Sequence, residues 1–226
     1  MKSALVTGGS SGIGLAIARA LRGEGYNLTL AARKVERLEA AGVELETATM
    51  PVDVRDEDAC RALVEAHVGR FGGLDVLVNS AGVGIAGTIG DLTTKAWNLQ
   101  QDVNLRGTFL MTREALPHLR AARGYVLNLA SIAGTVATPG LAGYGASKAA
   151  VIAFTRSLIR EEADNGVRAT ALCPGFVDTP MAAWTGLAGE EMIQPEDCAE
   201  LALALLRLSP AARVPVVVVE RGGDET

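Results

Sequence analysis

Short apolar runs alternate along the chain with longer segments in which apolar residues recur every three or four positions. Seven runs have the length of strands: Ala4–Val6, Leu28–Ala31, Val52–Val54 with the residues just before it, Leu74–Val78, Tyr125–Leu129, Val167–Leu172 and Val214–Val219. Several are apolar at successive positions, as parallel strands covered on both faces are. Helical periodicity covers Ile13–Leu21, Asp56–Val68, Lys95–Leu119, Ala146–Glu162 and Glu196–Leu206. This alternation predicts βαβ units and an α/β fold with a doubly wound, seven-stranded parallel sheet flanked by helices.

Three prolines refine these boundaries. We expect Pro117 near the end of the long helix, because an interior proline interrupts the hydrogen-bond ladder. Pro195 suits the first turn of the last helix. Pro215 places the last strand at an edge of the sheet or marks its first residue. With no linker or repeat along the chain, we expect one domain over residues 1–226.

A glycine-rich loop, Thr7–Gly14, follows the first strand and opens the first helix. Glycines let the backbone turn tightly and approach a pyrophosphate, and a helix N-terminus supplies free N–H groups. The spacing differs from the commonest dinucleotide motif, so a plain glycine-rich turn is the alternative. The dinucleotide interpretation assigns cofactor contacts to Gly8, Ser10, Ser11, Gly12, Ile13 and Gly14.

The end of the second strand bears on the choice of cofactor. Sites for NAD usually carry an acidic residue here that binds the ribose hydroxyls, and this chain has none. Arg33 instead offers a guanidinium suited to the 2′-phosphate of NADP. Alternatively, Arg33 is a solvated residue at the start of a helix. We predict NADP rather than NAD.

Tyr144 and Lys148 lie four positions apart in a segment with helical periodicity, and Lys148 is one of only four lysines. On a helix this spacing brings both side chains to one face, which also happens by chance. A free tyrosine has a pKa near ~10. A cation roughly 4 Å away would favour the phenolate by about 4 kcal/mol. The pair therefore predicts a proton donor and acceptor that works near neutral pH.

Together these motifs resemble the classical short-chain dehydrogenase/reductase family, which has a Rossmann-type fold. The resemblance runs from Ser3 to about Gly223. It rests on the glycine loop, on Asn79-Ser80-Ala81-Gly82 with Ser80 in place of a second Asn, on Asn104, on Ser131, on the pair Tyr144 and Lys148, and on the turn Pro174–Thr179. Six matches in the right order make coincidence a poor explanation.

The resemblance implies a catalytic tetrad of Asn104, Ser131, Tyr144 and Lys148. NADPH would deliver a hydride to a carbonyl carbon, and Tyr144 would protonate the developing alkoxide or deprotonate the alcohol in reverse. Ser131 would donate a hydrogen bond to the substrate oxygen. Lys148 would lower the pKa of Tyr144 and hold the nicotinamide ribose, and Asn104 would hold a water beside Lys148.

Further cofactor contacts follow from the same resemblance. Asp53 and Val54 would contact the adenine, and Asn79, Ala81 and Gly82 would line the floor below the cofactor. Beside the nicotinamide amide would lie Pro174, Gly175, Val177 and Thr179. Two alternatives stay open: Asn79 ties neighbouring strands together, or Thr179 caps a turn.

The chain departs from the family in its substrate lid, which is short and rich in Ala and Gly over about residues 181–194. Trp184 either covers a substrate or packs the lid down. The segments Lys95–Leu119 and Ala146–Glu162 resemble the helices that pair subunits, which implies a homodimer or homotetramer. The end Arg221-Gly222-Gly223 lacks the Asp of the family's Asp-Gly-Gly, which leaves the terminal subunit contact open.

Composition excludes several other classes of protein. A net charge of −5 argues against a basic nucleic-acid-binding surface. Cys60, Cys173 and Cys198 are too widely spaced for a disulfide framework or a zinc site, so we expect no metal and a reducing, cytoplasmic location. We also expect no signal peptide, and no apolar run approaches the ~20 residues of a membrane span.

The sequence therefore predicts an NADP-dependent oxidoreductase acting on a carbonyl or a secondary alcohol (a CH–OH donor). The alternative is an NADP-sensing regulator without catalysis, although the complete tetrad favours the enzyme. An epimerase or dehydratase would need a longer substrate domain. The pocket should be mostly apolar, lined by Val83, Ile85, Ala133, Thr135, Met181 and Trp184, with no charged residue to recruit an anionic substrate.

Overall fold

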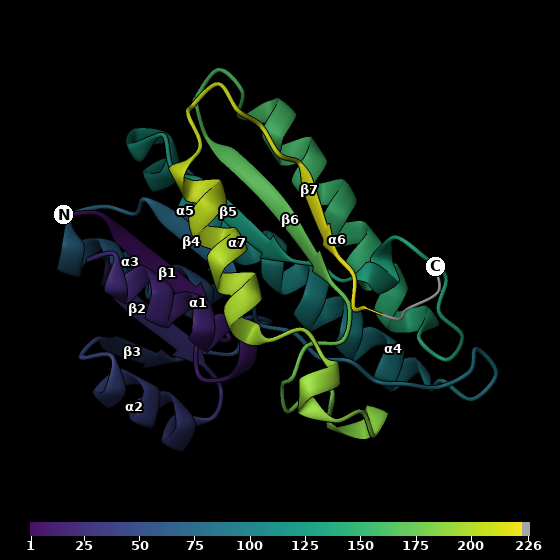
Figure 1. Ribbon diagram of the computed structural model, residues 1–226. Coiled ribbons are helices and arrows are strands. Elements are labelled where there is room, and N and C mark those ends of the chain that lie inside the picture. Colours follow the sequence, from purple (N-terminus) through teal and green to yellow (C-terminus); the bar gives the residue numbers. More distant parts are fainter. Residues whose placement is uncertain (223–226) are drawn as a thin grey trace.

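Seven parallel strands form one sheet in the computed structural model, which describes residues 1–222. The spatial order is β3-β2-β1-β4-β5-β6-β7 (Figure 1). The strands are β1 Ser3–Thr7, β2 Asn27–Ala32, β3 Ala48–Pro51, β4 Val76–Asn79, β5 Tyr125–Leu129, β6 Arg168–Pro174 and β7 Val216–Val219. The predicted doubly wound parallel sheet is confirmed.

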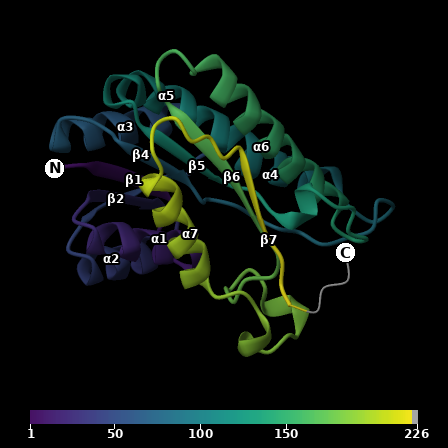
Figure 2. The ribbon, with the colours of Figure 1, turned by 45° about the horizontal axis from the view of Figure 1, so that its top comes forward.

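Helices cover both faces of this sheet (Figures 1 and 2). On one face lie α1 Gly12–Gly23, α2 Val35–Glu44 and α7 Pro195–Arg207. The other face is covered by α3 Glu57–Phe71, α5 Gly107–Ala122 and α6 Ala142–Glu161. The remaining helical pieces are α4 Thr94–Gln100, a π-helical turn Gln101–Arg106 and three short 3-10 turns, Ile132–Gly134, Ala183–Thr185 and Gly189–Glu191.

Two elements near the cavity differ from the sequence prediction. The helix α2 was not predicted, because it buries only Leu38, Ala41 and Gly42 and its other residues are exposed. The third strand ends at Pro51, so Val52 and Val54 lie just beyond it. Their side chains are nevertheless buried. An apolar run reports burial, so the sequence placed the strand at these residues and not at the four before them.

The stretch predicted as one long helix is three pieces, because the chain passes through the π-helical turn between α4 and α5. Pro117 lies inside α5, which continues past it to Ala122. The helix α6 begins at Ala142, earlier than predicted, so Tyr144 lies in its first turn. Pro195 opens α7 and Pro215 directly precedes the edge strand β7, as expected.

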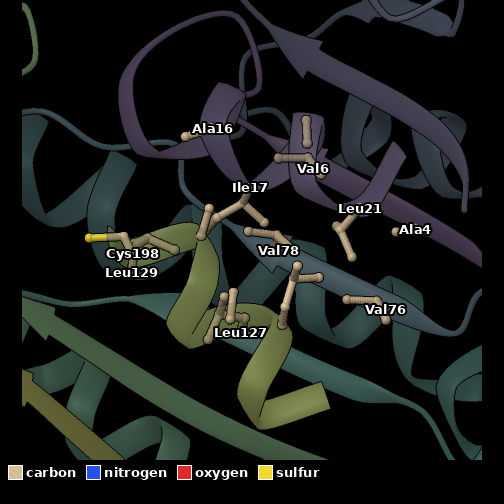
Figure 3. Packing of buried hydrophobic residues seen from close by; sticks show 14 of the residues in the cluster. Ala4, Val6, Ala16, Ile17, Leu21, Val76, Val78, Leu127, Leu129 and Cys198 are labelled. Atoms are coloured by element: carbon tan, nitrogen blue, oxygen red, sulfur yellow. The ribbon is translucent and has the colours of Figure 1, made fainter. Parts of the chain in front are cut away.

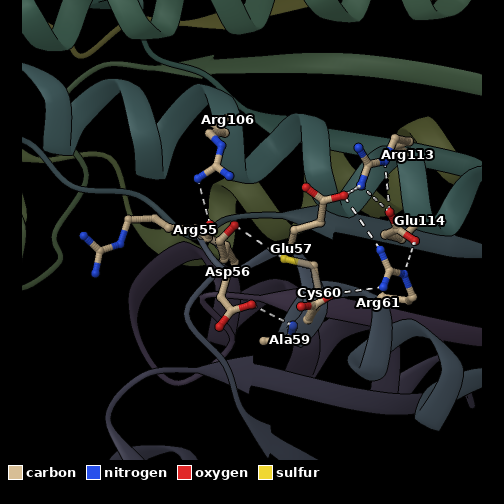
Figure 4. A network of polar contacts seen from close by, with 11 residues as sticks. Arg55, Asp56, Glu57, Ala59, Cys60, Arg61, Arg106, Arg113 and Glu114 are labelled. Atoms are coloured by element: carbon tan, nitrogen blue, oxygen red, sulfur yellow. Dashed lines mark hydrogen bonds and ion pairs between the residues drawn. The ribbon is translucent and has the colours of Figure 1, made fainter.

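The apolar core forms on both faces of the central strands. Ile17 and Leu21 of α1 pack with Cys198 of α7 over Val78 and Leu127 of the sheet (Figure 3). On the opposite face, α3 and α5 are joined outside the core by ion pairs, including Arg113 to Glu57 at 2.6 Å (Figure 4). Because these charged groups are exposed, the apolar contacts stabilise this face far more than the ion pairs do.

A buried histidine links three elements below the cavity. His67 of α3 contacts the Thr29 hydroxyl through Nδ1 at 2.8 Å and the Ser3 hydroxyl through Nε2 at 3.1 Å. Burial lowers the pKa of His67 to about 4, with a smaller contribution in the same direction from His118. His67 is therefore neutral in the folded protein at neutral pH.

This burial predicts an acid-sensitive stability. Because the pKa of His67 is lower in the folded chain than the reference of about 6.5, the unfolded chain takes up the proton first as the pH falls. The free energy of unfolding should decrease between pH 6.5 and 4, by about 3 kcal/mol from this group. Denaturant unfolding of His67→Gln should show a much smaller decrease than the wild type, whereas His118→Gln removes only the smaller effect on the His67 pKa and should change the decrease far less. Equal slopes in wild type and His67→Gln would contradict the assignment.

Candidate active site

A cavity of about 930 Å³ runs along the carboxyl ends of the strands, where open α/β sheets bind ligands. Its wall comes from the segments that follow β1 to β6. The wall includes most predicted site residues: Gly8, Ser10, Ser11, Gly12, Ile13, Arg33, Asp53, Val54, Ala81, Gly82, Ser131, Tyr144, Lys148, Pro174, Gly175, Val177 and Thr179. Three predicted residues, Gly14, Asn79 and Asn104, lie behind it.

The glycine loop lies unusually close to the segment after β4. Gly8 has a φ of +66°, and a Cβ on it would lie 2.7 Å from the Ala81 nitrogen. A Cβ on Gly14 would lie 2.5 Å from the Gly8 carbonyl oxygen, so Gly14 supports the loop from behind. The helix α1 begins here, and the side chain of its N-cap Ser11 makes no capping hydrogen bond. Its first N–H groups and positive dipole end therefore remain available to an anion.

Three cations line the cavity at the end of β2. Arg33, Lys34 and Arg37 are all exposed there, with Arg37 in the first turn of α2. Sequence reasoning found only Arg33. Recognition of α2 would have placed Arg37 in its first turn, directly after the end of β2 that carries Arg33. These side chains make this end of the cavity strongly positive.

Asp53 faces the same end and is held by its neighbour Arg55. The Arg55 Nη2 donates to Asp53 Oδ2 at 2.6 Å, and Nε donates to Oδ1 at 3.0 Å. This hydrogen-bonded guanidinium keeps the pKa of the Asp53 carboxyl below its usual range, with a smaller contribution from the charge of Arg33. Arg106 in turn donates to the Arg55 carbonyl at 2.9 Å, so both ends of Arg55 are fixed (Figure 4).

Tyr144, Lys148 and Ser131 meet on the opposite wall. Lys148 lies one turn after Tyr144 on α6, is 5% exposed and donates to the Leu129 carbonyl at 2.5 Å. Its Nζ lies 5.7 Å from the centre of the Tyr144 ring. Ser131 follows β5; its hydroxyl accepts from the Ala133 N–H at 3.2 Å and lies 3.5 Å from the Pro174 carbonyl oxygen. The four-residue spacing thus brings phenol and ammonium together, as the helix argument predicts.

The charges in this cluster differ from expectation. Burial raises the pKa of Tyr144, opposed by a smaller effect of a hydrogen bond from Ser131. Burial also lowers the pKa of Lys148 to about 8. The predicted net lowering of the Tyr144 pKa is not found, because burial has the larger effect and the Lys148 ammonium lies over the ring and donates to the Leu129 carbonyl. Tyr144 is a protonated phenol at neutral pH.

Asn104 joins two parts of the site from behind the wall. In the π-helical turn, its Oδ1 accepts from the Val83 N–H at 2.8 Å, and its Nδ2 donates to the Val83 carbonyl and the Ser147 hydroxyl, each at 2.9 Å. A Cβ on Gly82 would lie 3.4 Å from Asn104 Oδ1 and 3.6 Å from Lys148 Nζ. Asn104 thus fixes the loop after β4 against α6, close to Lys148.

Asn79 is also buried behind the wall. Its Nδ2 donates to Thr112 Oγ1 at 3.1 Å and to Asn128 Oδ1 at 2.9 Å. These bonds connect β4 with α5 and β5, which is the strand-tying role left open from the sequence. The Asn79 Oδ1 has no partner among the described residues.

The lid contributes an aromatic pair. Trp184 is 60% exposed, and its ring meets that of Phe176 edge-to-face at 6.0 Å. Both line the cavity, as do the predicted pocket residues Val83, Ala133 and Met181, whereas Ile85 and Thr135 do not. Thr179 packs against the glycine loop, since a Cβ on Gly12 would lie 2.9 Å from its Cγ2. Of the terminal Arg221-Gly222-Gly223, Gly223 lies outside the described residues.

Two negative findings apply to residues 1–222. No group of three or more His, Cys, Asp or Glu side chains there could hold a metal ion, and the three cysteines are buried and free. No helix in that range is long and apolar enough to cross a membrane.

Comparison with known proteins decides the family. A model of the short chain dehydrogenases matches residues 2–187. The chain belongs to the short-chain dehydrogenase family. An uncharacterised oxidoreductase of Staphylococcus epidermidis is 38% identical over 202 residues, which covers 88% of each chain. Another, from Staphylococcus saprophyticus, is 37% identical over 225 residues and 96% of each chain. The protein is therefore an oxidoreductase of this family.

Two solved structures of this family superpose closely on the chain. An alcohol dehydrogenase from the archaeon Thermococcus sibiricus, complexed with 5-hydroxy-NADP, has a TM-score of 0.93 at 32% identity and covers 100% of this chain and 99% of its own. A variant of actinorhodin polyketide ketoreductase, with NADPH, has a TM-score of 0.90 at 34% identity; the match covers 97% of this chain and 95% of the ketoreductase chain. Both are similar over almost the whole short-chain dehydrogenase fold.

The Asn104 contacts predict a large structural cost for losing its amide. Asn104→Ala would leave the Val83 N–H, the Val83 carbonyl and the Ser147 hydroxyl without their partner, and should lower the free energy of unfolding by about 2–4 kcal/mol. Gln101→Ala is the matched control, because Gln101 lies in the same turn and makes a single bond, to the Gly143 carbonyl. It should cost about 1 kcal/mol. If denaturant unfolding shows the same loss of free energy of unfolding for Asn104→Ala and Gln101→Ala, Asn104 does not fix the loop after β4 against α6 as described.

Proposed function

We propose that the protein transfers a hydride between NADP(H) and a carbonyl or secondary alcohol, with Tyr144 as the acid–base group. One observation carries the proposal: the Tyr144 phenol, Ser131 hydroxyl and buried Lys148 share one wall of a cavity whose far end is lined by cations. An NADP-sensing protein without catalysis would need the cationic end but not the phenol, hydroxyl and ammonium together.

The residues present fit NADP. The close approach of Gly8 to Ala81 leaves no room for a side chain there, and the free first turn of α1 suits a pyrophosphate. Arg33 and Arg37 would bind the 2′-phosphate, and Asp53, fixed by Arg55, would accept from the adenine amino group. The other residues that would contact the cofactor are Ser10, Ile13, Val54, Gly82, Pro174, Gly175, Val177 and Thr179. The two similar solved structures, described with 5-hydroxy-NADP and NADPH, support the same choice.

At neutral pH the protonation states suit the reduction step, in which Tyr144 donates a proton. When bound, the nicotinamide supplies the hydride. Tyr144 has a raised pKa, so its phenol carries the proton that a developing alkoxide needs. Ser131 donates a hydrogen bond to the same oxygen and stabilises its charge. Lys148, with a pKa of about 8, keeps most of its charge at pH 7 and is held by the Leu129 carbonyl; it would bind the nicotinamide ribose.

The assembly and location follow as further proposals. The chain forms one domain, because a single sheet carries all the described helices. The surface of α5 and α6 would pair copies in a homodimer or homotetramer, supported by Phe109, which is 42% exposed and packs on Phe154 at 6.4 Å. The cytoplasmic location and the small-molecule partner, without nucleic acid or membrane, stay predictions from the sequence.

The role of Tyr144 predicts a selective loss of turnover. Tyr144→Phe removes the proton donor and should lower kcat for ketone reduction by about 10²- to 10⁴-fold. NADPH should still bind, measured by its fluorescence on titration with protein. Tyr26→Phe removes a hydroxyl outside the cavity wall and should keep full activity. Turnover retained in Tyr144→Phe would contradict the mechanism. If the wild type binds NADPH but reduces no ketone, the NADP-sensing regulator is favoured instead.

The cationic end predicts the cofactor preference. Arg33→Asp removes a charge-assisted hydrogen bond to the 2′-phosphate and should weaken NADPH binding by at least about tenfold, while the new carboxylate improves NADH binding. Arg70→Asp, on α3 and outside the cavity wall, makes the same charge change as a control. An unchanged ratio of NADPH to NADH dissociation constants in Arg33→Asp would remove Arg33 from the site.

A further inference from the structure

Of the charged side chains that line the cavity among the described residues, all but one lie at one end. These side chains are Arg33, Lys34, Arg37, Asp53 and Lys148. The first four lie at the ends of β2 and β3 and in the first turn of α2. The end formed by the loop before α6 and by the lid is lined by uncharged side chains, chiefly Val136, Pro139, Leu141, Phe176, Met181 and Trp184.

This uncharged end lies directly beside the Tyr144 phenol. A Cβ on Gly84 would be 3.6 Å from the Tyr144 ring and 3.8 Å from the Met181 sulfur, so Met181 and Tyr144 flank one space. The absence of a side chain at Gly84 keeps that space open. The loop after β4 is tied to the loop before α6 by a hydrogen bond from the Gly87 N–H to the Gly140 carbonyl at 2.8 Å. A compound held at Tyr144 thus has open space for a substituent at this end.

No group at this end is available to neutralise an anion among the described residues that line it. The Lys148 ammonium is 5% exposed, bonds to the Leu129 carbonyl and lies against the Tyr144 ring. Ala142 and Gly143, whose N–H groups begin α6, are not among the residues that line the cavity. A carboxylate or phosphate on the substrate would lose water without gaining a charged partner, which is strongly unfavourable.

Large apolar side chains are instead exposed around this end. Trp184 is 60% exposed, Met181 45% and Val136 44%. An apolar substituent lying among them would remove their surface from water, which favours binding in proportion to the area covered. The indole is also fixed edge-to-face on Phe176, so it offers a preformed surface.

We propose that the substrate is an uncharged ketone, or the matching secondary alcohol, whose larger substituent is apolar and lies among Val136, Met181 and Trp184. This inference rests on the proposed function for the reaction but makes a separate statement about which ligands the site binds. Phosphorylated and carboxylate-bearing carbonyl compounds are excluded as good substrates.

Four ketones that carry the charge on the larger substituent, away from the carbonyl, separate charge from apolar surface: methyl 4-acetylbenzoate, 4-acetylbenzoate, methyl levulinate and levulinate, each assayed with NADPH. Each ester should exceed its acid in kcat/KM by at least about tenfold, the lower range of what an unpaired charge costs. Methyl 4-acetylbenzoate should also exceed methyl levulinate. An acid equal to or better than its ester would overturn the proposal.

A substitution at Met181 tests the charge argument within the same site. Met181→Arg places a cation at this end and should lower the ester-to-acid ratio for the acetylbenzoate pair by about tenfold. Met181→Gln has a similar length without charge and should keep the ratio near the wild-type value. A ratio that does not change in Met181→Arg, or that changes equally in both variants, would contradict the assignment of this end.

A binding measurement keeps this inference distinguishable from the reaction. The chain has two tryptophans, so Trp97→Phe leaves Trp184 as the sole indole. In the presence of NADP⁺, which cannot reduce a ketone, methyl 4-acetylbenzoate should quench Trp184 fluorescence at lower concentrations than 4-acetylbenzoate. If it does so while none of the four compounds oxidises NADPH, the proposed reaction fails and the ligand class stands. If the acid quenches as well as the ester, or neither quenches, the ligand class is overturned.

Discussion

The site depends on the close approach of the β1 and β4 chain ends in the middle of the sheet. Strands β2 and β3 lie to one side of β1, and β4 to β7 lie to the other, so the connections leave this point in opposite directions. Gly8 and Gly14 allow the approach, since a Cβ on either would lie within 3 Å of a neighbouring backbone atom. The cavity follows from this geometry, because helices on both faces diverge there and leave the strand ends uncovered.

Charge then varies along the cavity in a way that separates recognition from chemistry. Arg33, Lys34 and Arg37 make the β2 end positive, whereas the β5 and β6 end contains one ammonium, Lys148, that burial and the Leu129 carbonyl hold in place. The same burial that lowers the Lys148 pKa raises that of Tyr144 and keeps its phenol protonated. A dianionic cofactor phosphate and a neutral carbonyl therefore suit opposite ends.

The sequence predicted the sheet well, because buried parallel strands are apolar on both faces and stand out from their surroundings. It missed α2, whose short buried stripe of Leu38 and Ala41 is surrounded by charged residues, and with it the cations Lys34 and Arg37. It also could not show on which side of the wall a motif residue lies. Asn104 and Asn79 match motifs beside the cavity, yet both face inward and bond to backbone or buried polar side chains.

The protonation of Tyr144 was beyond the sequence for a related reason. Spacing gives the proximity of two groups on a helix, but the pKa depends on burial and on which atoms the ammonium contacts. The crystal structure of the protein with NADP⁺ is the most direct test of the whole arrangement. It should show the 2′-phosphate between Arg33 and Arg37, the pyrophosphate at the start of α1 and the nicotinamide beside Tyr144 and Ser131. A nicotinamide lying away from Tyr144, or a 2′-phosphate bound by neither arginine, would contradict it.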